Sequence, residues 1–386
     1  MGVILLQNGL YDDHSHFLTA TLGWIDASRA RGFALRIHAS RHVRPEIRAM
    51  TGAIPTFDQA PDSQVIQDPA FRGLGNLAEL GFSFAAGCRA IRSDSIGPDD
   101  LIVLDYAAPG DVFGLSLWLA RLPAGRRPRV HCQFHLGDPD WSLDAATGRL
   151  VGDTAPHGYA MRRLDAVAGA GRVVHAATTR RLAQVLESVA GRCRESPLTV
   201  CVADPATEAR LLSENAGSHD VAVVGQLRWE RGRALLADVL REFAARRPGR
   251  SAAVQVATPE QADALRQAVP DPKALRLTIR VGNLSADDYT RMLLSARIIL
   301  LPYHAPNYRL RASGVMGEAV AYGRPVVVPD GTWMSEQLAE GLAAAIDRLH
   351  ALSATAAARR ARWRARHSFP AYVDFVLAHG EPARTP

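Results

Sequence analysis

Short apolar runs alternate with longer amphipathic stretches along the first half of the chain. Such runs are typical of strands buried in a parallel sheet, and the stretches between them are long enough for helices. We predict strands at residues 3–6, 33–38, 101–104, 129–134, 172–176 and 198–202, and helices at 18–31, 112–121, 162–168 and 179–193. Regular alternation of strand and helix indicates an open, doubly wound α/β layer.

The alternation loosens near residues 203–218 and then starts again. The second half predicts strands at 221–224, 252–256, 277–281, 298–301 and 326–328, and helices at 233–246, 351–366 and 371–378. We therefore expect an α/β protein with two Rossmann-like, doubly wound parallel-sheet domains. The predicted boundaries are 1–207 for the N-terminal domain, 208–352 for the C-terminal domain and 353–386 for the terminal helices.

Composition excludes several classes of protein. The 386 residues are 47% hydrophobic and 22% charged, which is typical of a globular chain rather than a disordered one. No run of 18 apolar residues is present, so no segment is expected to cross a membrane as a helix. Asp12 and Asp13 interrupt the apolar start too soon for a signal peptide. Four cysteines without a C-x-x-C pair indicate a reducing, cytoplasmic compartment.

The net charge of +6 is compatible with an anionic partner but does not indicate which kind of partner binds. Basic residues gather around one aromatic side chain in the predicted helix at 351–366: Arg359, Arg360, Arg362, Trp363, Arg364 and Arg366. Such a helix could contact anionic lipid at the inner face of a membrane, although we favour a solvated helix. Basic and aromatic residues do not alternate over a predicted sheet face, so we expect no nucleic-acid partner.

The first candidate site is the turn at residues 225–232, directly after the predicted strand at 221–224. Gly225 would let a phosphate approach the backbone closely. Arg228 and Arg231 could each donate charge-assisted hydrogen bonds to a diphosphate, worth about 1.5–3 kcal/mol apiece. The alternative is a loop whose arginines are simply solvated.

The second candidate site follows the predicted strand at 298–301. The loop and the helix start that it contains are formed by Tyr308, Arg309, Arg311, Ser313, Gly314 and Val315. The first N–H groups of a helix are unpaired and carry the positive end of its dipole, so a helix start beside arginines favours anions. Glu318, about one turn inside, could reach the same ligand. An ordinary αβ connection with a solvated arginine loop is the alternative.

Together the two segments resemble the donor-binding domain of GT-B glycosyltransferases, in particular glycosyltransferase family 4 (group 1). That family ends its first turn with lysine and glycine, where Arg231 and Gly232 stand here. It also carries an E-x7-E segment followed by A-x-x-x-G-x-P-V-V, matched by Glu318, Ala319, Gly323, Pro325, Val326 and Val327. The resemblance covers about residues 221–335. Two positions differ from the family's pattern. Leu310 occupies the position of the first glutamate of E-x7-E, and Gln226 occupies the position of an arginine in the turn.

The resemblance implies a retaining, metal-independent transferase of polysaccharide biosynthesis. It would move a sugar from a nucleotide-sugar donor to a glycan, lipid-linked or small-molecule acceptor, without a cofactor. The two domains would face each other across a cleft, with residues 353–386 packing back toward the N-terminal domain. Glu318 would bind the ribose, Arg228 and Arg231 would hold the diphosphate, and Arg311 would be a further clamp. Tyr308 and the amides near Ser313, Gly314 and Val315 would complete the donor site.

Histidines of the N-terminal half are candidates for the acceptor side. His14 and His16 lie in the first predicted strand–helix loop. His135 ends the predicted strand at 129–134, at a position that resembles the family's active-site histidine. Histidine titrates near neutrality and can orient or relay a proton, so we assign His135 to catalysis with Arg231 and Glu318. A hydrogen-bonded structural histidine is the alternative at each position.

Asp138 and Asp140 form the one D-x-D sequence, which binds a metal in other transferases. Gly137 and Pro139 beside them favour an ordinary turn, so we expect no metal site.

Two other functions stay open. A catalytically silent GT-B subunit that binds a partner or a nucleotide is favoured by Leu310 and by the short chain after Trp333. A GT-B-type sugar-nucleotide epimerase or hydrolase would use the same donor pocket but needs no acceptor.

Overall fold

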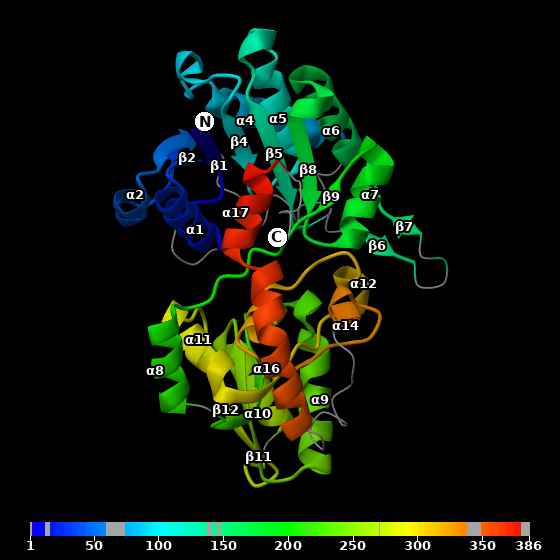
Figure 1. Ribbon diagram of the computed structural model, residues 1–386. Coiled ribbons are helices and arrows are strands. Elements are labelled where there is room, and N and C mark those ends of the chain that lie inside the picture. The colour runs from blue at the N-terminus through cyan, green and yellow to red at the C-terminus, as the bar shows by residue number, and fades with distance from the viewer. Residues whose placement is uncertain are drawn as a thin grey trace. The chain divides into compact units, whose positions relative to one another are not determined.

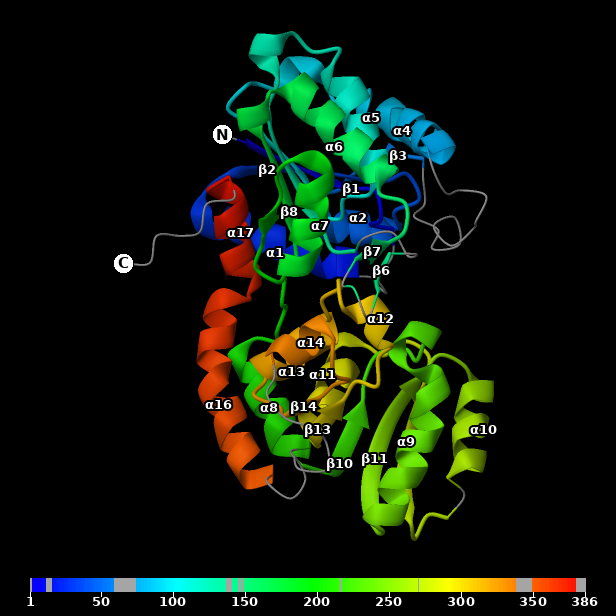
Figure 2. The same cartoon turned by 90° about the vertical axis from the view of Figure 1, so that its right-hand side faces the viewer.

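A computed structural model describes residues 2–11, 16–58, 74–136, 141–144, 147, 149–215, 217–269, 271–337 and 349–379. The chain forms two compact units, which Figures 1 and 2 show from two sides. Unit 1 comprises Met1–Thr199 and Phe369–Pro386, and unit 2 comprises Val200–Ser368. The terminal segment 353–386 is therefore divided between the two units.

Unit 1 is built on a seven-stranded sheet in the order β3-β2-β1-β4-β5-β8-β9. Its strands are β1 (Gly2–Gln7), β2 (Ala34–Ser40), β3 (Ile54–Phe57), β4 (Leu101–Leu104), β5 (Arg129–Phe134), β8 (Val173–Ala177) and β9 (Arg194–Glu195). Every neighbouring pair is parallel. β1 lies between β2 and β4, so the connections proceed in opposite directions on its two sides. A doubly wound fold binds ligands at such a switch point.

Helices cover both faces of this sheet (Figure 2). On one face lie α1 (His16–Arg31), α2 (Pro45–Thr51) and α17 (Phe369–Leu377). On the other lie α4 (Leu74–Cys88), α5 (Pro109–Leu119), α6 (Ala155–Ala168) and α7 (Arg180–Ala190). A short antiparallel hairpin, β6 (Ser142–Leu143) and β7 (Leu150–Val151), precedes α6.

A buried carboxylate ties the C-terminal helix to the sheet of unit 1. Asp105 follows β4 and accepts hydrogen bonds from the Tyr372 hydroxyl of α17, from Trp24 Nε1 at 3.3 Å and from Gln7 Nε2 at 3.3 Å. Burial raises the pKa of Asp105 to about 6, while the three donors act in the opposite direction. Residues distant in sequence thus satisfy one buried polar group, which fixes α17 in place.

Unit 2 is built on a five-stranded parallel sheet in the order β12-β11-β10-β13-β14. Its strands are β10 (His219–Val223), β11 (Arg250–Val256), β12 (Leu275–Val281), β13 (Ala296–Leu300) and β14 (Val326–Val327). α9 (Arg233–Arg246) and α10 (Pro259–Ala268) pack on one face through a core that includes Leu240, Phe243 and Val254. β10, between β11 and β13, marks a second switch point.

The other face of the unit 2 sheet carries the remaining long helices (Figure 2). They are α8 (Pro205–Asn215), α11 (Ala286–Ser295), α13 (Gly314–Ala321) and α16 (Leu349–Arg366). Two short helices, α12 (Ala305–Tyr308) and α14 (Trp333–Gln337), lie in the connections around β14.

The α/β fold with two doubly wound parallel sheets is confirmed, but one predicted strand is wrong. Residues 198–202 are all described, and they form no strand. Leu198 and Val200 are nevertheless buried, so their apolar pattern reflects burial of an extended connection rather than pairing in a sheet. The edge of the unit 1 sheet is instead formed by β9, whose residues Arg194 and Glu195 carry no apolar signal.

The basic helix predicted from the sequence, α16, uses several of its side chains within unit 2. Arg360 and Arg364 form ion pairs of 2.5 and 2.9 Å with Glu208 of α8, whose side chain is only 4% exposed. Trp363 Nε1 donates to a backbone carbonyl of α13 at 3.0 Å. These contacts fasten α16 to α8 and α13. In the described part of the chain, no helix combines the length and the apolar character needed to cross a bilayer.

The Glu208 ion pairs give a first prediction. Glu208→Gln leaves two arginines without a counter-charge, and breaking a buried ion pair from one side typically costs 3–5 kcal/mol. The arginine side chains are 35% and 28% exposed, so solvent weakens the penalty and we expect a loss of about 2–3 kcal/mol in the free energy of unfolding. Urea denaturation measures it. Glu214→Gln, which removes an exposed pair with Arg210, should cost less than about 0.5 kcal/mol, and equal losses would contradict the assignment.

Candidate functional site

The turn after β10 is shaped for close approach of a ligand to the backbone. Gly225 has a φ of +90°, and its N–H donates to Gln255 Oε1 at 2.9 Å. A Cβ at position 225 would lie 2.7 Å from Arg231 Nη1 and 3.5 Å from a methyl group of Val315. Only glycine therefore fits here, and its backbone lies beside both the guanidinium and the start of α13.

The end of the same turn is fixed against the segment that follows β13. The 3-10 turn η5 (Trp229–Arg231) ends at Gly232, which has a φ of +85°. A Cβ on Gly232 would lie 1.8 Å from the carbonyl oxygen of Pro302. The His304 N–H donates to the Glu230 carbonyl at 2.9 Å. The loops after β10 and β13 thus form one rigid rim at the switch point.

Arg231 lies among tyrosines at this rim. Its Cζ is 6.0 Å from the ring centroid of Tyr303, and the rings of Tyr303 and Tyr308 are 4.5 Å apart. Burial raises the pKa of Tyr308 to about 12, so its hydroxyl stays protonated at neutral pH. Within the described chain, the buried Arg231 Nε has no hydrogen-bond partner. Its hydrogen-bonding capacity is therefore not used by the described residues.

The start of α13 opens beside these groups. Ser313 caps the helix, and its Oγ accepts from the Met316 N–H at 3.1 Å. Gly314 is exposed, and a Cβ added to it would meet no atom of the described residues within 4 Å. The helix dipole favours an anion at this exposed end of α13.

Glu318 lies one turn inside α13 and accepts a hydrogen bond from the Tyr289 hydroxyl of α11. Burial raises the pKa of Glu318 to about 7, although the Tyr289 donor and the charge of Arg231 oppose the shift. The residue keeps part of its surface exposed. A carboxyl group that changes charge near neutral pH thus belongs to the same edge of the sheet as Arg231.

The remaining predicted residues of unit 2 occupy different environments. Arg228 is exposed on the turn, where its carbonyl accepts from the Arg231 and Arg233 N–H groups at 3.1 and 3.2 Å. Arg311 is partly exposed, and the loop expected around Tyr308 contains α12. Leu310, at the family's first glutamate position, is 2% exposed and belongs to the core.

Several residues at this edge were not selected from the sequence. Gln255 is the second-last residue of β11, and its Nε2 donates to the Gly282 carbonyl at 2.9 Å, so it bridges the loops after β10 and β12. A buried glutamine in an apolar strand is a signal that could have identified it. Tyr289 gave no such signal, because its bond to Glu318 joins two helices that are separate in sequence.

Of the three histidines predicted for the acceptor side, His135 is the one whose side chain the structure describes. Its Nε2–H donates to the Asp105 carbonyl at 2.8 Å, and its ring stacks on Tyr106 with centroids 4.2 Å apart. These contacts fix the orientation of the imidazole at the end of β5. His14, Asp138 and Asp140 lie outside the described residues. His16 begins α1, but its side chain is not among those described.

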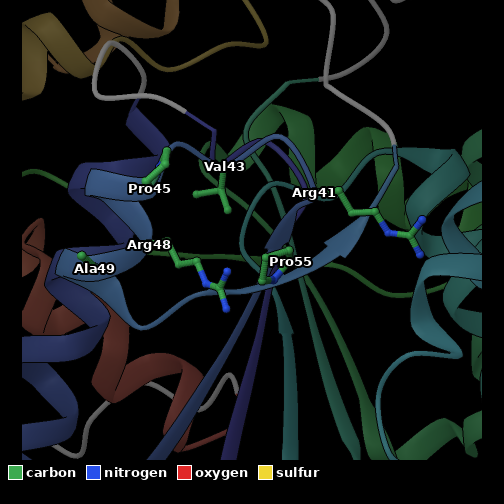
Figure 3. Close-up of a pocket in the computed structure, with 6 residues that line it drawn as sticks. All are labelled: Arg41, Val43, Pro45, Arg48, Ala49 and Pro55. Atoms are coloured by element: carbon green, nitrogen blue, oxygen red, sulfur yellow. The ribbon is translucent and has the colours of Figure 1, made fainter.

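A hollow of about 400 Å³ lies elsewhere in unit 1, between the end of β2, α2 and β3 (Figure 3). It is lined by Arg41, Val43, Pro45, Arg48, Ala49 and Pro55. Arg48 extends toward Pro55, whereas Arg41 pairs with Asp58 at 2.6 Å. No predicted site residue lines this hollow, so it does not mark the candidate site. Among the side chains that the structure describes, no three His, Cys, Asp or Glu residues gather as a metal site requires.

No family model and no curated protein matches the sequence. Solved structures match it in fold. HepE from Anabaena, in complex with UDP, has a TM-score of 0.62 at 12% identity, covering 98% of this chain and 99% of that chain. A glycosyltransferase from Rickettsia africae ESF-5 has a TM-score of 0.62 at 12% identity, covering 98% and 97%. A putative UDP-N-acetylglucosamine 2-epimerase from Listeria monocytogenes has a TM-score of 0.54 at 12% identity, covering 98% and 95%. The likeness shows that the chain has the GT-B fold, with two Rossmann-like units.

Proposed function

We propose that this chain is a glycosyltransferase that takes its sugar from a nucleotide-sugar donor. The observation that carries the proposal is the convergence of Gly225, Arg231, the open start of α13 and Glu318 at one edge of one sheet. A guanidinium beside a helix N-terminus suits a diphosphate, and a carboxylate next to it suits the hydroxyls of a ribose. The fold likeness to HepE, solved with UDP and with UDP-glucose, supports the same class of ligand.

In the proposed reaction, the bond between the anomeric carbon and the diphosphate oxygen breaks. A new bond forms from the anomeric carbon to an acceptor hydroxyl, whose proton passes to the departing diphosphate once the first bond has broken. Negative charge therefore accumulates on the leaving diphosphate. Arg231, held beside Tyr303 and Tyr308, stabilises this charge together with the amides at the start of α13. Groups that are oriented before the reaction pay no reorganisation cost at the transition state.

The resemblance to family 4 supports a more detailed form of the proposal. The reaction would be retaining and metal-independent, and the acceptor would be a glycan, a lipid-linked sugar or a small molecule of the cytoplasm. Arg228 and Arg311 would add positive charge around the donor. His135 would orient or relay a proton on the acceptor side, where its bond to the Asp105 carbonyl fixes the ring.

Two alternative functions are each favoured by a separate observation. The likeness to the putative epimerase from Listeria monocytogenes favours a sugar-nucleotide epimerase. The burial of Leu310, which leaves no carboxylate at the family's first glutamate position, favours a catalytically silent subunit.

A panel of radiolabelled nucleotide sugars, each incubated with and without mixed glycan and lipid-linked acceptors, separates these functions. Label transferred to an acceptor supports the proposed transferase. A changed or released sugar in the absence of any acceptor supports an epimerase or hydrolase instead. Unchanged donor throughout, with nucleotide binding intact, supports a silent subunit.

The raised pKa of Glu318 predicts how donor affinity depends on pH. Only the ionised carboxylate accepts both ribose hydroxyls, and a group with a pKa of about 7 is roughly one-tenth ionised at pH 6 and nine-tenths ionised at pH 8. Affinity for the nucleotide sugar should therefore rise about tenfold from pH 6 to pH 8. The diphosphate of a nucleotide sugar is a diester without an ionisation in this range. Calorimetry on wild type and Glu318→Gln measures the effect, and a slope that persists in the variant would assign it to another group.

A further inference from the structure

We propose that Trp229 and His304 form a wall at the rim of the candidate site that binds one face of a sugar ring. This inference rests on the proposed function, which supplies the class of ligand. Trp229 begins η5 and is 61% exposed, and His304 follows β13 and is also exposed. Their ring centroids are 5.5 Å apart, with planes inclined by 54°. The two rings come from different loops and meet beside the turn that carries Arg228 and Arg231.

The backbone holds both rings in place. Gly232 packs directly against the Pro302 carbonyl, which fixes the turn of Trp229 to the segment of His304. The bond from the His304 N–H to the Glu230 carbonyl, 2.9 Å long, joins the same two segments at a second point. Because neither loop has to become ordered on binding, a ligand would lose little affinity to conformational entropy.

The imidazole of His304 is also oriented by a side chain. Its Nδ1 lies 2.5 Å from Oδ1 of Asn307, which is itself buried. An amide oxygen only accepts, so Nδ1 carries the proton in the neutral ring and Nε2 carries the lone pair. His304 thus offers a hydrogen-bond acceptor of fixed direction beside the exposed indole.

A pyranose ring matches these two groups. One face of the ring presents C–H groups, which pack on the flat surface of an indole, and its edge presents hydroxyls, which require hydrogen-bond partners. A lone exposed tryptophan would need no explanation. Here the tryptophan is paired with an oriented acceptor and lies in the turn proposed to hold the diphosphate. The sugar could be the hexosyl group of the donor or the terminal sugar of the acceptor.

Calorimetry on three probes tests the wall and identifies the source of the sugar. UDP tests the nucleotide site alone, UDP-glucose tests the donor sugar, and maltotriose in the presence of UDP tests an acceptor sugar. We expect Trp229→Leu and His304→Phe to lower the affinity for UDP-glucose or for maltotriose at least tenfold. The same variants should change the affinity for UDP less than twofold. Phe82→Leu is the matched control, because Phe82 is also 61% exposed but belongs to unit 1, and it should leave all three affinities unchanged.

Each outcome decides between the proposals. A loss confined to UDP-glucose assigns the wall to the donor sugar, and a loss confined to maltotriose assigns it to the acceptor. If UDP binds and neither sugar-containing probe is affected by the variants, the wall is refuted while the nucleotide site stands. If UDP does not bind to the wild-type protein, the proposed nucleotide site and the wall fail together for this nucleotide and this sugar class.

Discussion

Arg231→Ala is expected to lower kcat/KM for sugar transfer by about 10²–10³-fold while the protein stays folded. Removing one pre-oriented donor from a charge that develops in the transition state typically has an effect of this size. Arg231→Lys keeps a point charge but loses the planar fork that Tyr303 and Tyr308 orient, so we expect an intermediate loss of roughly tenfold. Steady-state kinetics with the active nucleotide sugar measure both effects.

The matched control for Arg231 is Arg241→Ala in the neighbouring helix α9. Arg241 is exposed and pairs with Asp238 at 2.6 Å, away from the rim. Its removal should change kcat/KM by less than twofold, since exposed pairs contribute little to structure. Normal turnover in Arg231→Ala would refute the assignment of this residue to the leaving diphosphate.

Gly232→Ala is expected to destabilise unit 2 by roughly 2–5 kcal/mol and to abolish transfer. A non-glycine residue in the left-handed region costs about 1–2 kcal/mol. The added Cβ would also lie 1.8 Å from the Pro302 carbonyl, and forcing such an overlap apart typically costs about 1–3 kcal/mol more. Because the turn then moves, Arg231 leaves its place beside Tyr303.

Gly249→Ala separates these two causes. Gly249 has a φ of +79°, and no atom of the described chain lies within 4 Å of its Cβ position, so only the backbone cost of about 1–2 kcal/mol applies. Urea unfolding of both variants measures the difference. If Gly249→Ala is as damaging as Gly232→Ala, the close contact with Pro302 does not matter.

The architecture follows from the sequence because its signals are local. The apolar run before Gly225 predicts β10, and Ser313 before an apolar stretch predicts the start of α13. Parallel strands place the ends of β10 and β13 at one edge, so Arg231 and Ser313 could be expected to belong to one site. The alternation of strands and helices loosens near residues 203–218 and then starts again, which predicts the second, similar unit.

The parts that could not be predicted depend on contacts between distant segments. Tyr289 and Glu318 are separate in sequence, and only the packing of α11 beside α13 makes the bond that sets the environment of the carboxyl group. The pair of Trp229 and His304 likewise depends on contacts between the loops after β10 and β13, namely Gly232 on Pro302 and the His304 N–H on the Glu230 carbonyl. The strand predicted at residues 198–202 is wrong for a related reason, since burial of Leu198 and strand pairing leave the same apolar pattern.

A thermal-shift measurement with UDP, GDP, ADP, dTDP and CMP tests the central claim, a nucleotide site at the carboxyl edge of the unit 2 sheet, most directly. A ligand at a hundred times its dissociation constant stabilises a protein by about 2.7 kcal/mol. For a unit of this size, that corresponds to a rise of about 5 °C or more in melting temperature. We predict such a rise for at least one nucleotide with wild type and its loss with Arg231→Ala. No shift with any of the five, or an equal shift in the variant, would contradict the claim.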